Sequence, residues 1–256
     1  MARTRPPILE PPGPGRAIIE PEDLHQRRRR IPARVVLCFF YEVIEELAAQ
    51  GEVTRITEVR GEGPPIPIYA AGQGRRRVTL CWPGLTAPYA AAVLEELIAR
   101  GGRAFIACGG AGVLDETVGV GSVILPDAAL RGEGTSYSYQ RRGRYSRPHP
   151  DALRALRAAC REAGEPYRTG KTWTTDGIFR ETPALIRQRK AEGCLTVEME
   201  TAAFFAVARY RDVVFGQVLY AGDDVGGDEW NHRGWNRMGQ RRRSLLDLAL
   251  AACRKL

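Results

Sequence analysis

The chain has 256 residues, a formal net charge of +8 and 44% hydrophobic residues. This length favours one large domain over two, and this hydrophobic content excludes a disordered chain. The longest apolar stretches fall short of the roughly 20 residues that span a bilayer, so we expect no membrane helix and no membrane partner. Residues 1–15 have no apolar segment, which predicts a flexible N-terminal tail, with the folded domain in residues 16–256.

The cysteines, histidines and arginines limit the possible compartment, metal sites and partners of the protein. The six cysteines form no C-x-x-C pair and lie mostly in apolar runs, which favours a reducing cytoplasm. Because the three histidines are also far apart in sequence, we predict no metal site. Arginine runs at residues 27–30, 75–77 and 241–243 lack interleaved aromatic residues. They therefore indicate solvated or oligomer-contact surface, or an anionic small ligand, and we expect no nucleic acid partner.

Short apolar runs alternate with amphipathic stretches, a pattern typical of βαβ units around a parallel or mixed sheet. The expected helices are residues 35–49, 86–100, 150–163, 184–192, 201–209 and 244–254. The expected strands are residues 67–71, 77–82, 104–108, 118–126, 170–175 and 213–221, with a polar aromatic loop at 131–139. A turn that contains glycine joins the first two of these strands, which predicts a hairpin.

A glycine cluster, Gly109-Gly110-Ala111-Gly112, follows the strand at 104–108. Small residues after a strand let the backbone approach a ligand closely, because no Cβ intervenes. The same residues also fit a tight turn or close packing of strands. The pattern alone favours neither interpretation.

Three separated segments together resemble the nucleoside phosphorylase superfamily, which contains uridine phosphorylase, purine nucleoside phosphorylases and methylthioadenosine nucleosidase. They are residues 84–112, the block Val197-Glu198-Met199-Glu200, and the strand that ends in Gly222-Asp223. Their order and spacing match across roughly residues 17–253. The resemblance implies an α/β single domain with a central mixed, partly barrel-like β-sheet flanked by helices. It also implies a cytoplasmic nucleoside-salvage enzyme, assembled as a homodimer or a trimer of dimers, that needs no cofactor.

In such enzymes the Val-Glu-Met-Glu block resembles the ribose-binding segment. By this resemblance Glu200 binds the sugar hydroxyls, Met199 packs on the sugar face and Glu198 lies nearby. A carboxylate can accept two hydrogen bonds from neighbouring hydroxyls and can stabilise the positive charge that grows on the sugar. The alternative is that one glutamate caps the helix that begins at Thr201, since acidic groups favour helix N-termini.

Asp223 resembles the acid that purine-cleaving members place at the base, where a protonated imidazole nitrogen makes the purine a better leaving group. The alternative is an aspartate that starts a turn. The segment before Glu181 is similar to the stretch that supplies a ring against the base. Ile178 or Phe179 then contacts the base, with Phe179 the better stacker, although Phe179 also fits a plain core position. The glutamine and arginine with which uridine phosphorylases bind the base are absent after this segment, and Arg180 and Glu181 are the candidates to replace them in base binding.

The chain departs from the family at the phosphate site, which ordinary members build from a Gly-Asp-Pro turn after the first strand and an Arg-x-Gly-Thr segment. Residues 17–19 resemble that first strand, but Glu20 and other acidic residues follow it. Ala107 takes the position of the arginine, and Gly110 that of the threonine. Each lost charge-assisted hydrogen bond is worth roughly 1.5 to 3 kcal/mol.

Three interpretations of the nucleophile therefore stay open. Phosphate, as a co-substrate, is bound in a pocket at Gly109 and Gly110 by other arginines; the candidates are Arg27, Arg55, Arg60 and Arg180. Alternatively, water attacks, with Glu20 or Glu22 as a base, and the enzyme is a nucleosidase. In the third, the chain binds a nucleoside without catalysis. Phosphorolysis is favoured, and Asp223 favours a purine over uridine.

Overall fold

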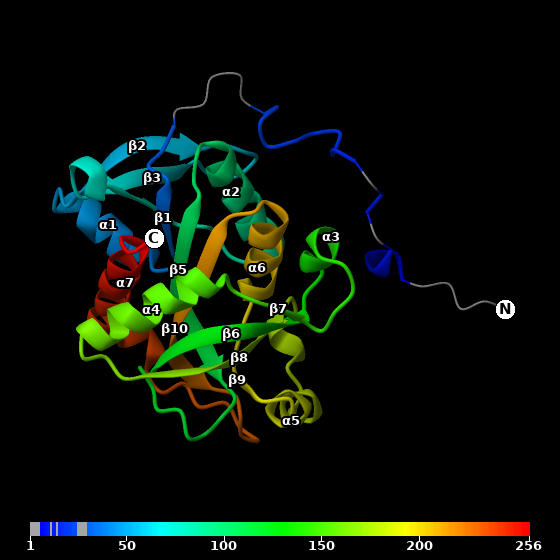
Figure 1. Ribbon diagram of the computed structural model, residues 1–256. Helices are drawn as coiled ribbons and strands as arrows, with labels where there is room; N and C mark the ends of the chain where they lie inside the picture. Colours follow the sequence, from blue (N-terminus) through cyan, green and yellow to red (C-terminus); the bar gives the residue numbers. More distant parts are fainter. Residues whose placement is uncertain (1–5, 11, 14, 25–29) are drawn as a thin grey trace.

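The computed structural model describes residues 6–10, 12–13, 15–24 and 30–256. Its centre is a 10-stranded mixed sheet with the path β10-β6-β8-β9-β5-β1-β4-β3-β2, and β7 pairs with β6 at the side (Figure 1). The strands are β1 (Arg34–Cys38), β2 (Val53–Val59), β3 (Ile66–Ala71), β4 (Val78–Cys81), β5 (Ala104–Val113), β6 (Val123–Gly132), β7 (Tyr145–Ser146), β8 (Tyr167–Thr175), β9 (Cys194–Glu198) and β10 (Val214–Asp224).

An additional pairing between β10 and β5 closes part of this sheet on itself. The ring runs through β5, β10, β6, β8 and β9, while β1, β4, β3 and β2 extend from it as an open sheet. The expected mixed, partly barrel-like sheet of a single α/β domain is confirmed. The predicted hairpin of β3 and β4 is also present, with antiparallel pairing from Ile68↔Cys81 to Ala71↔Val78.

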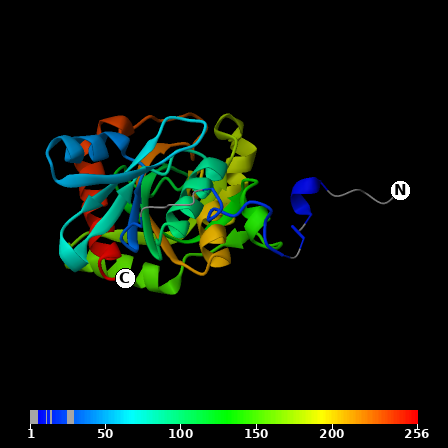
Figure 2. The same ribbon diagram turned by 90° about the horizontal axis from the view of Figure 1, so that it is seen from above.

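Helices cover both faces of the sheet (Figures 1 and 2). One hydrophobic cluster joins the sheet to α1, α4 and α7, and a second joins it to α2 and α6. The helices are α1 (Tyr41–Ala49), α2 (Ala87–Ala99), α3 (Ser136–Tyr139), α4 (Pro150–Glu162), α5 (Pro183–Ala191), α6 (Thr201–Tyr210) and α7 (Gly239–Cys253). The two clusters differ because consecutive strand residues point to opposite faces of the sheet. Thus Cys38 and Cys108 belong to the first cluster, and Leu37 and Ala107 to the second.

The first strand of the domain is β1, so the expectation of a strand at residues 17–19 is wrong. Residues 17–19 form no strand, and Ile18 is 99% exposed. The expected helix at 35–49 is correct only from Tyr41 onward, because residues 35–38 belong to β1 and are fully buried between β4 and β5. A short apolar run of this kind cannot be distinguished from a buried helix segment by periodicity.

The glycine cluster does not form a loop after the strand at 104–108. Strand β5 continues through it to Val113 and pairs in parallel with β10, with Leu219↔Gly109, Tyr220↔Gly110 and Ala221↔Ala111 in register. Of the two structural interpretations, close packing of strands is therefore correct. We call Gly109–Gly112 the glycine segment.

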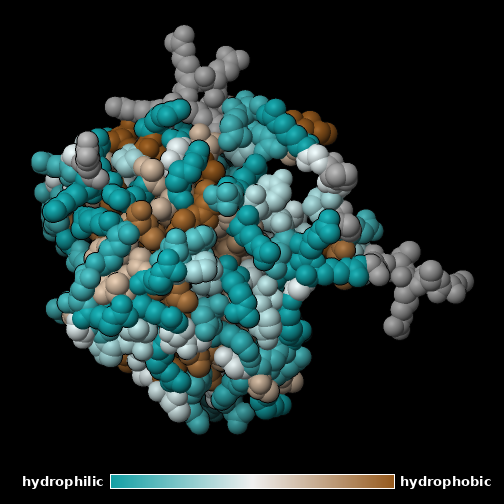
Figure 3. All heavy atoms as spheres, in the orientation of Figure 1, coloured by the Kyte–Doolittle hydropathy of each residue, from teal (hydrophilic) through white to brown (hydrophobic). Residues whose placement is uncertain are grey.

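The surface drawn in Figure 3 is mostly hydrophilic. The last arginine run lies on α7 and forms ion pairs within the chain: Arg241 with Glu165, Arg242 with Glu42, and Arg243 with Glu52. No helix in the described ranges combines the length and apolar character needed to cross a bilayer.

Candidate active site

The predicted sugar and base residues gather around the glycine segment. Gly112 pairs with Val197 of β9, and Asp223 Oδ1 lies 3.7 Å from the position that a Cβ on Gly112 would take. On the other side of the same segment, the ring of Phe39 lies 3.0 Å from the corresponding position on Gly109 and contacts Phe204 of α6. Glu200 lies three residues after Val197, the partner of Gly112, and stands at the N-terminus of α6.

Glu200 is held at the meeting point of two helices. Its Oε1 accepts a hydrogen bond of 2.6 Å from the backbone N–H of Thr86, which precedes α2. Thr86 has φ 72°, a left-handed conformation that is strained for a β-branched residue and that the surrounding contacts must maintain. Glu200 is 93% buried by residue area, and the bond from Thr86 engages only one of its two carboxyl oxygens.

Glu198 has a different task. One of its oxygens accepts hydrogen bonds from the backbone N–H groups of Glu200 and Thr201, at 2.8 and 2.7 Å. The other accepts from the hydroxyl of Thr174 at 2.6 Å. Glu198 is therefore the glutamate that caps α6, and this alternative applies to it rather than to Glu200. Its oxygens are already satisfied by the protein, so it orients Glu200 and is not placed to bind a sugar hydroxyl. Met199, between the two glutamates, is half-buried.

Burial and a like charge weaken the ionisation of Glu200. Desolvation, followed by the neighbouring charge of Glu198, raises the pKa of Glu200 to about 8. The charge of Asp176 acts in the same direction, which places Asp176 within electrostatic range of Glu200. Asp176 is itself fixed, since its Oδ2 accepts a 2.8 Å hydrogen bond from the backbone N–H of Gly134.

Asp223 lies within electrostatic range of a second carboxyl group, that of Glu181. Burial, followed by the charge of Asp223, raises the pKa of Glu181 to about 7. The indole N–H of Trp230 donates to Asp223 Oδ2 at 2.7 Å and fixes that carboxylate. Asp224, the neighbouring acid, is instead ion-paired with Arg233. The sequence alone indicates Glu181 only as a replacement for the absent pair, because its proximity to Asp223 depends on the fold.

The short segment between Asp176 and Glu181 connects the two ends of the site. It contains the 3-10 turn Ile178–Arg180, in which Phe179 is 93% exposed and Ile178 is 54% exposed. Phe179 is therefore not a core residue, and its ring is available to a ligand. Arg180 is also exposed. Because Asp176 is near Glu200 and Glu181 is near Asp223, this one turn spans the distance between the predicted sugar and base residues.

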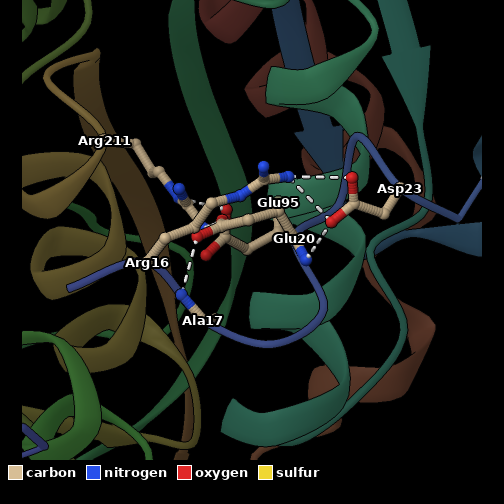
Figure 4. A network of polar contacts seen from close by, with 6 residues as sticks. All are labelled: Arg16, Ala17, Glu20, Asp23, Glu95 and Arg211. Carbon is tan, nitrogen blue, oxygen red and sulfur yellow. Dashed lines mark hydrogen bonds and ion pairs between the residues drawn. The ribbon is translucent and has the colours of Figure 1, made fainter.

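Glu20 does not join these residues. It accepts hydrogen bonds from the backbone N–H of Ala17 at 3.0 Å and from Arg211 at 2.9 Å, and Arg211 also binds Glu95 at 2.7 Å (Figure 4). Glu95 and Arg211 lie toward the C-terminal ends of α2 and α6, whereas Thr86 and Glu200 lie at their N-terminal ends. The structure thus separates Glu20 from the predicted nucleophile pocket, because its carboxylate pairs with Arg211.

Three of the four phosphate candidates proposed from sequence lie elsewhere or outside the described residues, whereas the fourth, Arg180, lies in the exposed turn Ile178–Arg180. Arg55 and Arg60 both pair with Glu58 on β2. Arg27 is outside the described residues. Since the first strand is β1, the segment that follows it is Phe39-Phe40-Tyr41, and the carboxylates expected after a strand at 17–19 are not at this position.

Two surface hollows, of about 380 and 230 Å³, contain neither Glu200 nor Asp223. They open near the N-terminal ends of β5 and β10, where Ala104 and Val214 line the larger one. We place the site at the glycine segment instead, because the orienting hydrogen bonds and the paired carboxyl groups are found there. In the described ranges no three Cys, His, Asp or Glu side chains are grouped to hold a metal ion.

A family model described as the phosphorylase superfamily matches residues 33–253. The chain belongs to this superfamily. The match begins one residue before β1, in agreement with β1 as the first strand of the domain.

The individual relatives have low sequence identity to this chain. The guanosine phosphorylase of Halorubrum lacusprofundi is 29% identical over 190 residues, which cover 70% of this chain and 79% of that protein. Among solved structures, the AMP nucleosidase of Bacteroides thetaiotaomicron is 26% identical, with a TM-score of 0.68 and 85% of each chain covered. The purine nucleoside phosphorylase of Toxoplasma gondii has a TM-score of 0.72 at 18% identity, covering 87% of this chain and 90% of that one. At that identity the similarity shows a shared fold.

Proposed function

We propose that this member of the phosphorylase superfamily cleaves the N-glycosidic bond of a purine ribonucleoside by phosphorolysis, which yields the free base and ribose 1-phosphate. The observation that carries the proposal is the turn from Asp176 to Glu181. Asp176 lies within electrostatic range of Glu200, and Glu181 lies within that range of Asp223, which supports a sugar-binding role for Glu200 and an acid role for Glu181 and Asp223.

The sugar end of the site fits a ribose. The backbone N–H of Thr86 fixes Oε1 of Glu200, so the carboxyl group is oriented before a ligand arrives. Hydroxyl groups that donate to it favour its ionised form, which offsets the burial that disfavours this form. A carboxylate so placed attracts the positive charge that develops on the sugar as the glycosidic bond breaks.

The base end fits a purine. Phe179 and Ile178 offer exposed apolar surface for stacking, and the acid pair can deliver a proton to an imidazole nitrogen of the leaving base. Protonation makes the base a weaker nucleophile and a better leaving group. A pyrimidine has no such nitrogen on its glycosidic ring, so these residues favour a purine over uridine. The guanosine phosphorylase relative supports the same choice.

Hydrolysis is the second candidate, and one observation favours it. The positions at which ordinary members carry phosphate ligands hold Phe39-Phe40-Tyr41, the fully buried Ala107 and Gly110, which have no cationic or hydroxyl donor apart from Tyr41. An AMP nucleosidase is also among the structural relatives. In that case water replaces phosphate as the nucleophile, with the same roles for Glu200 and Asp223.

Release of free base distinguishes these candidates. Inosine, guanosine, adenosine and uridine are each incubated with the protein, with and without inorganic phosphate. We expect release from a purine nucleoside only when phosphate is present. Release in both buffers would establish hydrolysis, and binding without release would show a nucleoside-binding protein that lacks catalysis.

A further inference from the structure

Arg242, from the arginine run at residues 241–243, lies next to the segment that follows β1. Arg242 lies in the first turn of α7, and its side chain is 14% exposed. Its guanidinium lies 5.6 Å from the ring centre of Phe40 and 5.6 Å from that of Trp235. Because Phe40 directly precedes α1, Arg242 reaches the segment that follows β1.

A single tyrosine connects this arginine to the glycine segment. Arg242 Nε donates to the hydroxyl of Tyr220 at 3.3 Å, and that hydroxyl donates to the carbonyl of Trp235 at 3.3 Å. The Tyr220 ring lies against Gly110, with Cε1 only 3.1 Å from the position that a Cβ there would take. Gly110 itself is exposed, although it lies in the central strand β5. The guanidinium is therefore one hydroxyl group away from an open stretch of strand backbone.

The charge of Arg242 is partly neutralised by one exposed carboxylate, that of Glu42. Its Nη1 is ion-paired with Glu42 in the first turn of α1, and the Glu42 side chain is 55% exposed. The bond to Tyr220 uses Nε and the ion pair uses Nη1, so neither of these contacts engages Nη2. An exposed carboxylate is held weakly, because water solvates it well when it moves away. The guanidinium, by contrast, is held between two aromatic rings and a tyrosine hydroxyl.

We propose that Arg242 binds the inorganic oxyanion of the reaction, phosphate, and that phosphate displaces Glu42 from it. A guanidinium can bind two phosphate oxygens at once, and the N-terminus of α1 adds a favourable dipole at the same place. This inference rests on the proposed phosphorolysis for its catalytic meaning. It does not rest on it for the binding of phosphate.

Two variants with opposite expected effects test the inference by kinetics. Arg242→Gln should raise the KM for phosphate about 10- to 100-fold, the loss expected for a charge-assisted bidentate contact, with a much smaller change in the KM for the nucleoside. Glu42→Gln should lower the KM for phosphate, because it removes the competing carboxylate. Arg243→Gln is the matched control, since Arg243 is the next residue of α7 and pairs with Glu52 instead. An unchanged KM for phosphate in Arg242→Gln would overturn the inference.

A binding measurement separates this inference from the proposed reaction. Phosphate should raise the Tm of the wild type and of Arg243→Gln above that in chloride of equal ionic strength, because a ligand that binds the folded state stabilises it. Arg242→Gln should lose most of this rise. If the wild type releases base without phosphate but shows this pattern, the phosphorolysis is wrong and the role of Arg242 stands. If phosphate raises the Tm of Arg242→Gln as much as that of the wild type, or does not raise the wild-type Tm, the inference is wrong.

Discussion

The backbone N–H of Thr86 donates a 2.6 Å hydrogen bond to Oε1 of Glu200, although 114 residues separate them in the chain. The bond joins the N-terminus of α2 to that of α6 and engages one of the two carboxyl oxygens of Glu200. The orientation of the predicted sugar-binding carboxyl is thus fixed by main-chain geometry.

Replacement of Glu200 by glutamine tests its charge. Glutamine can still accept the hydrogen bond from Thr86, but it cannot become negative. We expect kcat/KM for a purine ribonucleoside to fall about 10- to 100-fold at high pH, where Glu200 is ionised. Because the pKa of Glu200 is about 8, the ratio of wild-type to variant kcat/KM should increase between about pH 6 and about pH 9. A ratio that does not change with pH would contradict this role.

The same group should affect stability with a defined sign. The pKa of Glu200 is raised from 4.5 to about 8 in the folded protein, so its protonated form is favoured on folding. Its contribution is fully present below pH 4.5 and is lost as pH rises to about 8. Urea unfolding should therefore show the wild type losing stability relative to Glu200→Gln over this interval, by on the order of 1.4 kcal/mol for each pKa unit of the shift. If the difference in unfolding free energy between the wild type and Glu200→Gln were equal at both ends of this pH interval, the raised pKa of Glu200 would be excluded.

Removal of the acid at the base end should affect turnover rather than folding. We expect Asp223→Asn to lower kcat about 100-fold or more, with a Tm close to that of the wild type. Trp230→Phe serves as a comparison, because it removes the indole donor but keeps the carboxylate, and it should have a smaller effect. Near-normal turnover of Asp223→Asn would remove Asp223 as the acid.

The carboxyl pair should also determine the pH profile. Glu181 has a pKa of about 7 and loses its proton above this value, and a general acid must be protonated to donate. We therefore expect wild-type kcat/KM to fall as pH rises through about 7. Glu181→Gln should abolish or move this falling limb, as seen in profiles measured under identical buffers. A profile that is superimposable on that of the wild type would show that the proton is held elsewhere.

Glu198 should matter for the fold. Alanine at this position leaves the N–H groups of Glu200 and Thr201 and the hydroxyl of Thr174 without their acceptor. We expect a loss of roughly 1 to 3 kcal/mol in the free energy of unfolding. The exposed Glu229→Ala is a suitable control and should change stability by less than about 0.5 kcal/mol. Equal stability of the two variants in urea would show that the cap is dispensable.

Sequence patterns predicted most of the elements, and they failed where periodicity is ambiguous. Residues 35–38 are equally apolar on both faces because both faces are buried, and a helix and a strand of this length look alike. That error moved the expected first strand to residues 17–19 and brought Glu20 into the site. Once β1 is placed correctly, Phe39 and Phe40 follow it, and Arg242 becomes visible as the cation on that side.

The candidate site shows the same limit. The Val-Glu-Met-Glu block could be predicted because its four residues are contiguous, and Asp223 could be predicted because it stands at the end of an apolar strand. Glu198 and Glu200 differ in role because only the Glu198 carboxylate accepts hydrogen bonds from the N–H groups at the start of α6. The spacing of the two glutamates in the sequence does not determine which of them does so. The pairing of Glu181 with Asp223 and the reach of Arg242 depend on contacts between distant segments, for which the chain carries no local signal.

The most direct test of the central claim is a crystal structure with a purine nucleoside bound. Glu200 Oε2 should lie within hydrogen-bond distance of the ribose hydroxyls, while Asp223 or Glu181 lies within that distance of the imidazole nitrogen of the same base. A nucleoside bound away from the glycine segment, or one that touches only one of these two ends, would contradict the account.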